Sequence, residues 1–345
     1  MKKYYISSKS GSSGICKYSL DFFELVLKDK GYLFIDSSED LNSILTKIVS
    51  TDHVHIEIGI FQKKEIDILF TMLKAGYKNI AVTLHDAPLI KYPFRSFHNS
   101  FLNKVSKFYD IYINKFRDAR QFVSKIKTIY VLSRKGVELI ERTYNVKNVF
   151  YLPHILDERE LRNSDTNNNN FIYFGFIGRN KGIEYSLKVH EGLLSHYPEI
   201  NFYVVGRAIG RERKFYNLLK VKYKNNVHYL GYVPEDKVDE VFDKATFSIL
   251  PFRSYKFFMP VSGSIVYNLK KGKIIFTNNV NVVSETIRDG ETGFYLSGKI
   301  DEDIARICDV LSNKEALTRV KNVSYRYLLQ NHTARVVSKN LISSG

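Results

Sequence analysis

Short apolar runs alternate along the chain with segments whose apolar residues recur at helical spacing. In the first half these runs cover residues 32–35, 53–58, 80–84, 128–132 and 149–152. Amphipathic segments such as 19–28 and 64–74 lie between them. Alternation of strands with helices predicts a parallel sheet that is covered by helices on both faces.

The same alternation resumes after a polar, Asn-rich segment at 162–170, which is typical of a surface loop or linker. Strand-like runs follow at 170–177, 201–205, 227–230, 247–250 and 273–277. We therefore predict an α/β chain of two Rossmann-like, doubly wound domains, 1–160 and 161–324, which face a central cleft. The stretch from 315 to 342 is helical with polar interruptions, and we expect its last part, 325–345, to pack back on the first domain.

Length and composition agree with a two-domain globular protein, since the chain has 345 residues, of which 44% are hydrophobic and 26% charged. The apolar runs are too short to span a membrane. Two cysteines, Cys16 and Cys308, cannot form a disulfide framework or a four-thiolate zinc site. The first residues lack the apolar stretch of a signal peptide, so we expect a cytoplasmic protein.

The charge adds a preference for anionic partners. Lys and Arg number 52 against 36 Asp and Glu, a net charge of +16, which favours phosphate on nucleic acid, membranes or small molecules. Residues 89–135 contain eleven Lys and Arg against two Asp, interleaved with aromatic residues. This pattern suits an anionic membrane, such as the inner face of the plasma membrane, or a lipid-diphosphate acceptor. Alternatively, the aromatic residues face the core. No nucleic-acid module accompanies the charge, so we expect no nucleic-acid partner.

Candidate chemistry begins at residues 174–184, where a strand ends in a turn with Gly178 and leads into a helix. Arg179 and Lys181 stand at the start of that helix. Backbone N–H groups together with two cations can hold a diphosphate. The alternative is a plain strand-to-helix turn whose basic side chains are solvated.

An ordered set of motifs follows this turn. The second half contains 204–207, 227–234, 245–253, 262–263, 271–273 and 285–294, and the first half contains 11–14, 83–86, 131–134 and 151–154. In this order and spacing, the set resembles retaining glycosyltransferases of the GT-B fold, and more narrowly glycosyltransferase family four (group 1). The resemblance is strong from 171 to 298 and looser before that.

The resemblance implies a donor site in the second domain. Lys181 corresponds to the lysine that binds the donor diphosphate. Phe176 stands where the family usually has an arginine, and Arg179 could substitute for it. The turn of Tyr232 and Val233 corresponds to the contact with the nucleotide base. The implied donor-binding residues are Gly178, Gly206, Arg207, Tyr232, Val233, Ser262, Gly263 and Ser264, of which 262 and 263 open a helix suited to phosphate.

In the first domain, the resemblance implies that His85 faces the transferred sugar, which completes a catalytic set with Lys181 and Arg179. A histidine at a strand end can instead be a capping or packing residue. The glycine-containing loop and the residue after His85 are candidates for an acceptor or phosphate loop, although a tight turn explains the loop equally well. These residues are Gly11, Ser12, Ser13, Gly14 and Asp86.

The sequence departs from the family at one important place. Members often carry two glutamates eight positions apart, which contact the transferred sugar and the donor ribose. Those positions are occupied here by Met259 and Tyr267, which cannot accept hydrogen bonds as a carboxylate does. Some relatives have a different version of this region, which Pro251–Ser254 with 262–263 resembles, so the departure does not exclude activity.

The function implied is transfer of a hexose from a UDP- or GDP-linked sugar to a hydroxyl of a cell-surface polysaccharide or lipid-linked glycan precursor, with retention of configuration. We expect no cofactor and no metal. The acidic residues 301–303 have metal-site spacing, but their position indicates the start of a helix, where acidic side chains cap the first turn. The alternatives are a catalytically silent partner or glycan-binding protein of the same fold, and a nucleotide-sugar epimerase.

Overall fold

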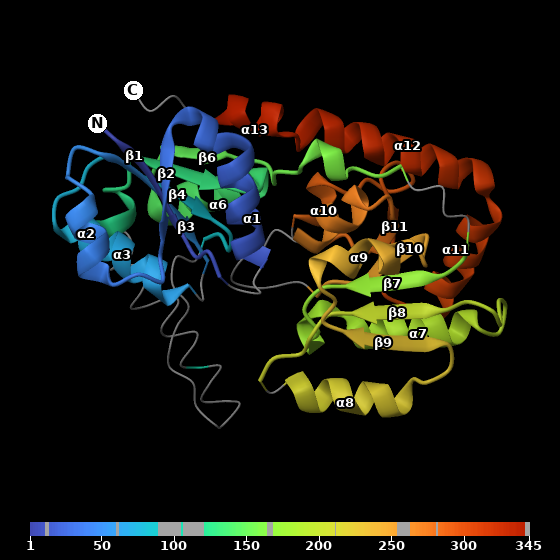
Figure 1. Cartoon of the computed structure of the whole chain (residues 1–345). Helices are drawn as coiled ribbons and strands as arrows, with labels where there is room; N and C mark the ends of the chain where they lie inside the picture. The colour runs from blue at the N-terminus through green and yellow to red at the C-terminus, as the bar shows by residue number, and fades with distance from the viewer. Residues whose placement is uncertain are drawn as a thin grey trace. The chain divides into compact units, whose positions relative to one another are not determined.

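The computed structural model describes residues 1–10, 14–59, 62–88, 105, 121–163, 168–210, 212–253, 263–280 and 282–341. They form two compact units. Unit 1 contains the described residues of Met1–Asp157 and His332–Gly345, and unit 2 those of Glu158–Tyr255 and Ser262–Asn331. Each unit has a parallel sheet of six strands with helices on its faces (Figure 1). The predicted α/β architecture of two Rossmann-like parts is thus confirmed.

The sheet of unit 1 has the strand order β2-β1-β3-β4-β5-β6. Its strands are β1 (Lys3–Ser7), β2 (Tyr32–Asp36), β3 (His53–Ile58), β4 (Ile80–Leu84), β5 (Thr128–Val131) and β6 (Val149–Tyr151). Every residue of β3 and β4 is buried. β4 carries apolar residues almost continuously, as strands covered on both faces do, whereas β3 alternates polar and apolar residues. The sequence pattern locates both strands.

The helices of unit 1 begin at residues suited to cap them. Asp40 accepts hydrogen bonds from the backbone N–H groups of Asn42 and Ser43, and Ser133 accepts one from Gly136. The helix expected at 19–28 begins earlier, at Gly14, and its second half is π-helical. The helical elements are α1 (Gly14–Phe22), η1 (Phe23–Leu27), η2 (Lys28–Lys30), α2 (Leu41–Lys47), α3 (Lys63–Lys74), α6 (Arg134–Tyr144) and α13 (Ala334–Asn340).

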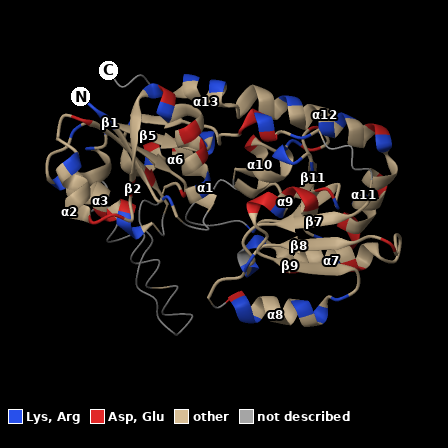
Figure 2. Ribbon diagram, viewed as in Figure 1, with Lys and Arg blue, Asp and Glu red and all other residues tan. Residues whose placement is uncertain are grey.

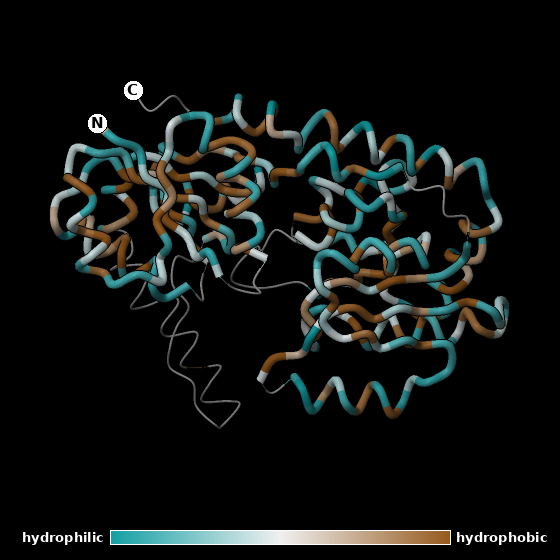
Figure 3. The backbone as a smooth tube through the Cα atoms, in the orientation of Figure 1, coloured by the Kyte–Doolittle hydropathy of each residue, from teal (hydrophilic) through white to brown (hydrophobic). Residues whose placement is uncertain are grey.

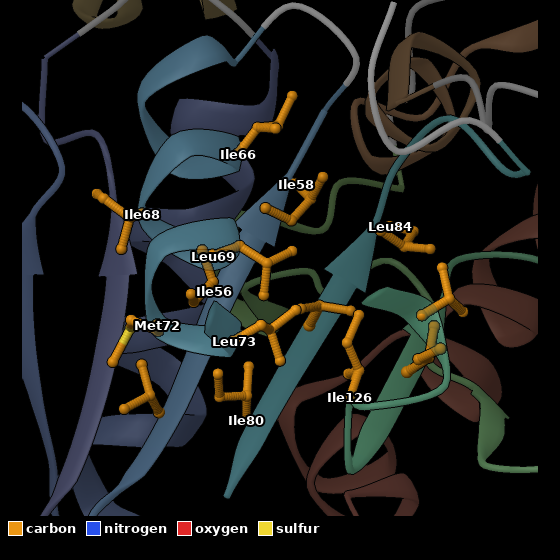
Figure 4. Close-up of a cluster of buried hydrophobic side chains, with 14 of the residues drawn as sticks. Ile56, Ile58, Ile66, Ile68, Leu69, Met72, Leu73, Ile80, Leu84 and Ile126 are labelled. Atoms are coloured by element: carbon orange, nitrogen blue, oxygen red, sulfur yellow. The ribbon is translucent and has the colours of Figure 1, made fainter. Parts of the chain in front are cut away.

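Two separate cores cover the faces of this sheet. On one face, Ile56 and Ile58 of β3 pack with Ile66 and Leu69 of α3 (Figure 4). The other face is covered by α1, η1 and α13, and it is rich in aromatic residues. Side chains alternate between the faces of a strand, so the odd-numbered residues of β3 lie on this aromatic side. These residues are His53, His55 and Glu57.

The sheet of unit 2 has the order β12-β11-β10-β7-β8-β9. Its strands are β7 (Phe171–Phe174), β8 (Phe202–Val205), β9 (Val227–Gly231), β10 (Phe247–Leu250), β11 (Ile274–Thr277) and β12 (Phe294–Tyr295). Read from β9, this is the Rossmann order in which the first and fourth strands of the unit lie side by side. The order reverses between β7 and β10, and doubly wound sheets bind ligands at the carboxyl ends of the strands at such a point.

The helical elements of unit 2 follow these strands as crossovers. They are η4 (Glu158–Glu160), η5 (Arg179–Lys181), α7 (Ile183–Leu193), α8 (Glu212–Lys222), α9 (Glu235–Phe242), α10 (Gly263–Lys270), η6 (Val283–Glu285), α11 (Ile300–Ser312) and α12 (Lys314–Asn331). Apolar residues gather along the strands (Figure 3), and Lys and Arg residues are frequent along α8 and α12 (Figure 2). Among the described residues, no helix combines the length and the apolar composition needed to cross a membrane.

The helical stretch expected from 315 to 342 is two helices, α12 and α13. Between them the chain is extended at Thr333, which forms a parallel bridge with Leu156. The backbone N–H of Leu156 donates to the carbonyl of His332, whose Nδ1 lies 2.7 Å from the carbonyl oxygen of His154. These contacts interrupt the helix. Val337 of α13 then packs in the aromatic core of unit 1.

Ion pairs fix the first residues of unit 2 to the body of that unit. Arg162 pairs with Asp239 of α9 at 2.6 Å and with Asp243 at 3.2 Å. Glu160 pairs with Lys270, at the end of α10. The polar segment expected to join two domains is therefore held at its beginning by unit 2.

Candidate functional site

The structure brings most of the predicted donor-binding residues to one end of the sheet in unit 2. Gly178 follows β7, Gly206 and Arg207 follow β8, and Tyr232 and Val233 follow β9. Gly263 and Ser264 open α10, the helix between β10 and β11. These positions all follow the carboxyl ends of parallel strands, from β10 and β7, where the strand order reverses, to the edge strand β9. Ser262 lies outside the described residues.

The turn after β7 is pressed against the end of β10. Gly182 has φ +74°, and a Cβ atom at this position would lie 1.9 Å from the carbonyl oxygen of Pro251. No side chain fits there without moving backbone. The close approach sets the first turn of α7 directly beside the residues that follow β10. A helix N-terminus at this place presents backbone N–H groups, which suit an anion.

A second close approach joins the ends of β7, β8 and β9. A Cβ on Gly206 (φ +144°) would lie 1.8 Å from the carbonyl oxygen of Gly175, and the Gly206 N–H donates to the carbonyl of Gly231 at 2.7 Å. A Cβ on Gly175 would lie 3.7 Å from the Cβ of Ser264. The first turn of α10 therefore lies beside the turn after β7, and backbone forms much of this surface.

The two cations of this turn have different surroundings. The guanidinium of Arg179 pairs with Glu212 of α8 at 3.4 Å and lies 4.5 Å from the ring of Phe215. The same glutamate accepts a hydrogen bond from the Arg179 backbone N–H at 3.0 Å. Lys181 instead places its Nζ 5.6 Å from the ring of Phe252, just after β10. Of the two, Lys181 is the cation beside the strand-order reversal.

The turn after β9 presents an aromatic side chain. Tyr232 is 65% exposed, and the guanidinium of Arg207 lies 5.9 Å from its ring centroid. Val233 packs against the core cluster that contains Val238 and Phe242. An exposed ring next to a planar cation offers a surface on which a flat base can stack.

Tyr267, one of the two positions that depart from the family pattern, is a packed residue of α10. Its ring stacks on Phe174 with centroids 4.6 Å apart, and its hydroxyl donates to Oε1 of Glu235 at 3.2 Å. Burial and the nearby Glu235 carboxylate raise the pKa of Tyr267. A carboxylate thus lies at this position, supplied by the first residue of α9 instead of by α10. Met259 lies outside the described residues.

In unit 1, His85 directly follows β4 and is held at both backbone and side chain. Its backbone N–H donates to the carbonyl of Ile58 at 3.0 Å. Its Nε2 lies 2.7 Å from Oε2 of Glu57, a residue with no exposed surface. The hydroxyl of Tyr5 donates to the other oxygen of Glu57 at 2.8 Å. Both carboxylate oxygens therefore have a hydrogen-bond partner, as a buried carboxylate requires.

Aromatic rings and further histidines surround this pair. Tyr18 of α1 meets His85 edge to face, with ring centroids 5.0 Å apart, and meets His154 at 5.2 Å. Burial lowers the pKa of His55 and of His154 to about 3, and that of His332 to about 4. These three histidines are therefore neutral at neutral pH.

The sequence pattern did not single out Glu57. The signal for it was present, because the residues of β3 alternate between apolar and polar across a strand whose neighbours are apolar. Alternation places His53, His55 and Glu57 on one face. A carboxylate on a buried face needs a partner, and a histidine that ends the next parallel strand on the same face can provide one.

The remaining predicted residues are placed as follows. Gly14 is the first residue of α1, and Asp86 follows His85. A Cβ on Gly59 would lie 3.6 Å from Oδ2 of Asp86 and 2.3 Å from Cδ1 of Ile15, so α1 and Asp86 meet at the end of β3. Gly11, Ser12 and Ser13 lie outside the described residues, as do 89–104 and 106–120 of the basic aromatic stretch.

The acidic residues at 301–303 have a structural role in part. Asp303 lies in the first turn of α11 and accepts hydrogen bonds from the backbone N–H groups of Ser297 and Gly298, at 2.6 and 3.1 Å. Within the part of the chain that the structure describes, no group of three or more His, Cys, Asp or Glu side chains is arranged to hold a metal ion.

Several solved structures share this fold. HepE of Anabaena, in complex with UDP, has a TM-score of 0.71, 12% sequence identity and 98% coverage of both chains. A glycosyltransferase of Rickettsia africae has a TM-score of 0.65 at 14% identity, with 98% of this chain and 96% of that chain covered. TarM has a TM-score of 0.65 at 12% identity over 87% of this chain, which spans only 56% of the length of TarM.

Sequence comparison identifies the family. No curated protein sequence matches the chain. Residues 155–327, half of the chain, match the family described as glycosyl transferases group 1. The match covers most of unit 2, including the strand ends that carry its predicted donor-binding residues. The chain therefore belongs to the glycosyl transferases group 1 family.

Proposed function

We propose that this protein transfers a hexose from a nucleotide diphosphate donor, bound at the carboxyl ends of the strands of unit 2, to a hydroxyl of a glycan acceptor. The observation that carries the proposal is the turn after β7. There Gly182 is pressed on the Pro251 carbonyl, so that Lys181 and the N-terminus of α7 lie together beside the strand-order reversal. Backbone N–H groups and an ammonium are suited to a diphosphate.

The nucleotide in this proposal is uridine diphosphate. HepE has been crystallised with UDP and with UDP-glucose, and its similar fold covers 98% of this chain. The exposed Tyr232 and Arg207 would flank the base. GDP-linked sugars are the alternative donors, and thermal unfolding with UDP and with GDP separates the two.

Sugar transfer in this proposal needs charge stabilisation and little covalent chemistry. The bond between the anomeric carbon and the β-phosphate oxygen breaks, and a bond from that carbon to the acceptor oxygen forms. The acceptor proton passes to an oxygen of the leaving diphosphate. Lys181 stabilises the negative charge that develops there, and fixed donors at the start of α7 require no reorganisation.

His85 in this proposal contacts the transferred sugar. Its ring is fixed by Glu57 and Tyr18, so a hydroxyl of the sugar would meet a side chain whose orientation is set in advance. The configuration at the anomeric carbon is retained, and the reaction proceeds without a metal ion or cofactor. Anomeric couplings in the NMR spectrum of the product test retention, and activity in the presence of EDTA tests metal independence.

The acceptor is a cell-surface polysaccharide or a lipid-linked glycan precursor. A TarM variant of S. aureus has been crystallised with alpha-GlcNAc-glycerol and UDP, which supports a glycan-type acceptor for a protein of this fold. The basic aromatic stretch at 89–135 would hold the protein to the anionic inner face of the plasma membrane. Sedimentation with vesicles of anionic lipid, compared with neutral vesicles, tests this attachment.

The experiment that tests the donor site is thermal unfolding with UDP, GDP, CMP and their sugar conjugates. A ligand at 100 times its Kd stabilises the folded protein by about 2.7 kcal/mol. We expect one nucleoside diphosphate to give such a shift and the Lys181→Ala variant to lose it. Lys188→Ala is the matched control, since Lys188 lies on α7 and pairs with Glu184.

Consumption of the donor separates the remaining functions. A transferase consumes the donor productively only when an acceptor is present, whereas an epimerase converts the donor alone. A catalytically silent partner gives neither result. The packed Tyr267, in place of a glutamate, is the observation that favours the silent partner. Stabilisation by no nucleotide would contradict the proposed donor site.

A further inference from the structure

We infer that Glu57 is a positioning residue that keeps the proton of His85 on Nε2, so that Nδ1 is the ring atom available to a substrate. The inference rests on the proposed function only for the identity of that substrate. Its basis is the 2.7 Å contact between Nε2 of His85 and Oε2 of Glu57. An ionised carboxylate accepts hydrogen bonds and cannot donate one, so a nitrogen in contact with it must carry hydrogen.

The surroundings of Glu57 make this arrangement stable. Glu57 is fully buried, and its other oxygen, Oε1, accepts the hydroxyl hydrogen of Tyr5 at 2.8 Å. Nε2 of His55 is 3.7 Å from the same oxygen, beyond hydrogen-bond distance, and lies 2.7 Å from Oγ1 of Thr83 instead. The carboxylate is therefore shared between Tyr5 and His85. Removal of either donor would leave a buried oxygen unsatisfied.

The sheet geometry fixes which residues can meet. Glu57 pairs with Thr83 across β3 and β4, and the backbone N–H of His85 continues the ladder by donating to Ile58. His85 comes two residues after Thr83, so Glu57 and His85 stand on the same face of the sheet. Their contact requires no loop closure, because it is determined by the register of two central parallel strands.

The ring plane of His85 is fixed by a second contact. Tyr18 meets it edge to face at 5.0 Å, with an interplanar angle of 84°. Rotation of the imidazole about its Cβ–Cγ bond would break both the Glu57 contact and this packing. His85 keeps 8% of its surface exposed, and among the described residues its ring makes a hydrogen bond only through Nε2. Nδ1 is thus the ring nitrogen without a hydrogen-bond partner among the described residues.

The charged and titratable groups around the pair are Tyr5, Tyr18, His55 and His154. Burial, with the Glu57 charge, raises the pKa of both tyrosines, and burial lowers the pKa of both histidines. All four are uncharged at neutral pH. The groups that contact the two oxygens of Glu57 at hydrogen-bond distance are therefore Nε2 of His85 and the Tyr5 hydroxyl.

Nitrogen NMR of isotope-labelled histidine tests the inference in the intact protein. His85→Asn assigns the His85 signals by their loss. We expect the wild-type Nε2 to show a protonated-type shift. In the Glu57→Gln variant, which can turn its amide NH₂ toward the ring, we expect the two nitrogen shifts to move toward each other. A wild-type signal with hydrogen on Nδ1 alone would overturn the inference.

Kinetics of the same variants test the consequence for transfer. We expect Glu57→Gln to lower kcat by about 100-fold, as a misplaced catalytic group does, with little change in the KM for the donor. The matched control is Glu65→Gln, which removes another buried glutamate of unit 1 whose Oε1 accepts from the hydroxyl of Ser37. An equal loss of kcat in both variants would overturn the positioning role.

Failure of the proposed function gives a different result. If the wild-type protein transfers no sugar but its His85 shows hydrogen on Nε2 that depends on Glu57, the transferase proposal fails and the control of the ring by Glu57 stands. If sugar is transferred and Glu57→Gln retains the wild-type kcat, the positioning role fails and the transferase proposal stands.

Discussion

The two units share a parallel sheet of six strands, yet the carboxyl ends of their central strands are built from different groups. In unit 1, this region contains buried side chains, with the Glu57 carboxylate between Tyr5 and His85 and neutral histidines nearby. In unit 2, it consists of glycine backbone, where Gly182 and Gly206 approach carbonyl oxygens that exclude a Cβ.

The difference teaches that one architecture can present ligand-binding groups in two ways. A network of hydrogen-bonded side chains places one particular atom, such as a ring nitrogen, and its hydrogen bonds depend on which groups are protonated. A backbone surface presents N–H groups that do not titrate, which suits a charged diphosphate common to many donors. Substitutions should therefore act sterically in unit 2 and through protonation in unit 1.

The largest effect should come from filling the backbone turn of unit 2. We expect Gly182→Ala to lower the free energy of unfolding by roughly 3 kcal/mol, since a Cβ would lie 1.9 Å from the Pro251 carbonyl oxygen at a φ of +74°. Nucleotide binding should be lost as well. Urea unfolding and nucleotide-dependent thermal shifts measure the two effects.

The control for this substitution is Gly290→Ala. Gly290 has a φ of +71°, but a Cβ there would meet nothing within 4 Å. Left-handed backbone alone should cost about 1 kcal/mol. Equal losses for the two variants would show that the contact with Pro251 does not constrain the turn.

Elements buried on both faces could be predicted well from the sequence. The apolar runs at 80–84 and 247–250 coincide with β4 and β10, because burial on both faces favours apolar residues throughout. The run at 53–58, which alternates polar and apolar residues, coincides with β3. The two-residue strand β12 gave no such run. The break between α12 and α13 depends on a bridge between Leu156 and Thr333, and no local pattern records a contact between positions so distant in the chain.

The candidate site was predictable to a similar degree. Glycines at strand ends pointed to the turns of unit 2, since their positions follow directly from the strand pattern. The pairing of Arg179 with Glu212 was not predictable, because it depends on how α8 packs beside η5. The alternation in β3 places Glu57 on a buried face, but its contact with His85 depends on the register of β3 and β4, which no local pattern gives.

Protonation should dominate the response of unit 1 to acid. Burial lowers the pKa of His154 to about 3, whereas an exposed histidine has a pKa of about 6.5. Between these values the unfolded chain binds the extra proton, so stability falls as the pH falls, by about 1.4 kcal/mol per pH unit for this histidine. We expect His154→Gln to reduce the slope of the free energy of unfolding against pH by that amount. Urea titrations at several pH values measure this slope.

His196→Gln, which replaces an exposed histidine of unit 2, controls for the substitution itself. His55 and His332 contribute to acid sensitivity in the same direction. An unchanged slope in His154→Gln would mean that the ring is protonated in the folded protein, contrary to its burial.

Unit 2 has a protonation effect of its own, at alkaline pH. Lys273 donates to the carbonyls of Phe242 and Ala245, and burial lowers its pKa to about 8. Between about pH 8 and 10.5 the unfolded chain retains a proton that the folded protein has lost, so Lys273 makes stability rise with pH. In this pH range we expect the free energy of unfolding of Lys273→Met to rise less steeply than that of the wild type, by about 1 kcal/mol per pH unit.

Urea unfolding of the wild type and of Lys273→Met in alkaline buffers measures the difference. Lys244→Met, which replaces an exposed lysine near the same turn, controls for the loss of one positive charge. Parallel slopes in Lys273→Met and the wild type would show that the buried ammonium does not lose its proton in this range.

The smallest effect should come from Tyr267→Phe, which removes a hydroxyl but preserves the ring that stacks on Phe174. Loss of the hydrogen bond to Glu235 should cost about 1 kcal/mol of stability.

If the Tyr267–Glu235 pair serves only packing, donor affinity stays at the wild-type value, as we also expect for Glu235→Gln. A weaker donor Kd in both variants, with stability held within that 1 kcal/mol, would instead place a side-chain pair in contact with the donor. Unit 2 would then combine its glycine backbone with a hydrogen-bonded side-chain network of the kind that unit 1 uses around His85. Isothermal titration with the nucleotide that stabilises the wild type distinguishes the two outcomes.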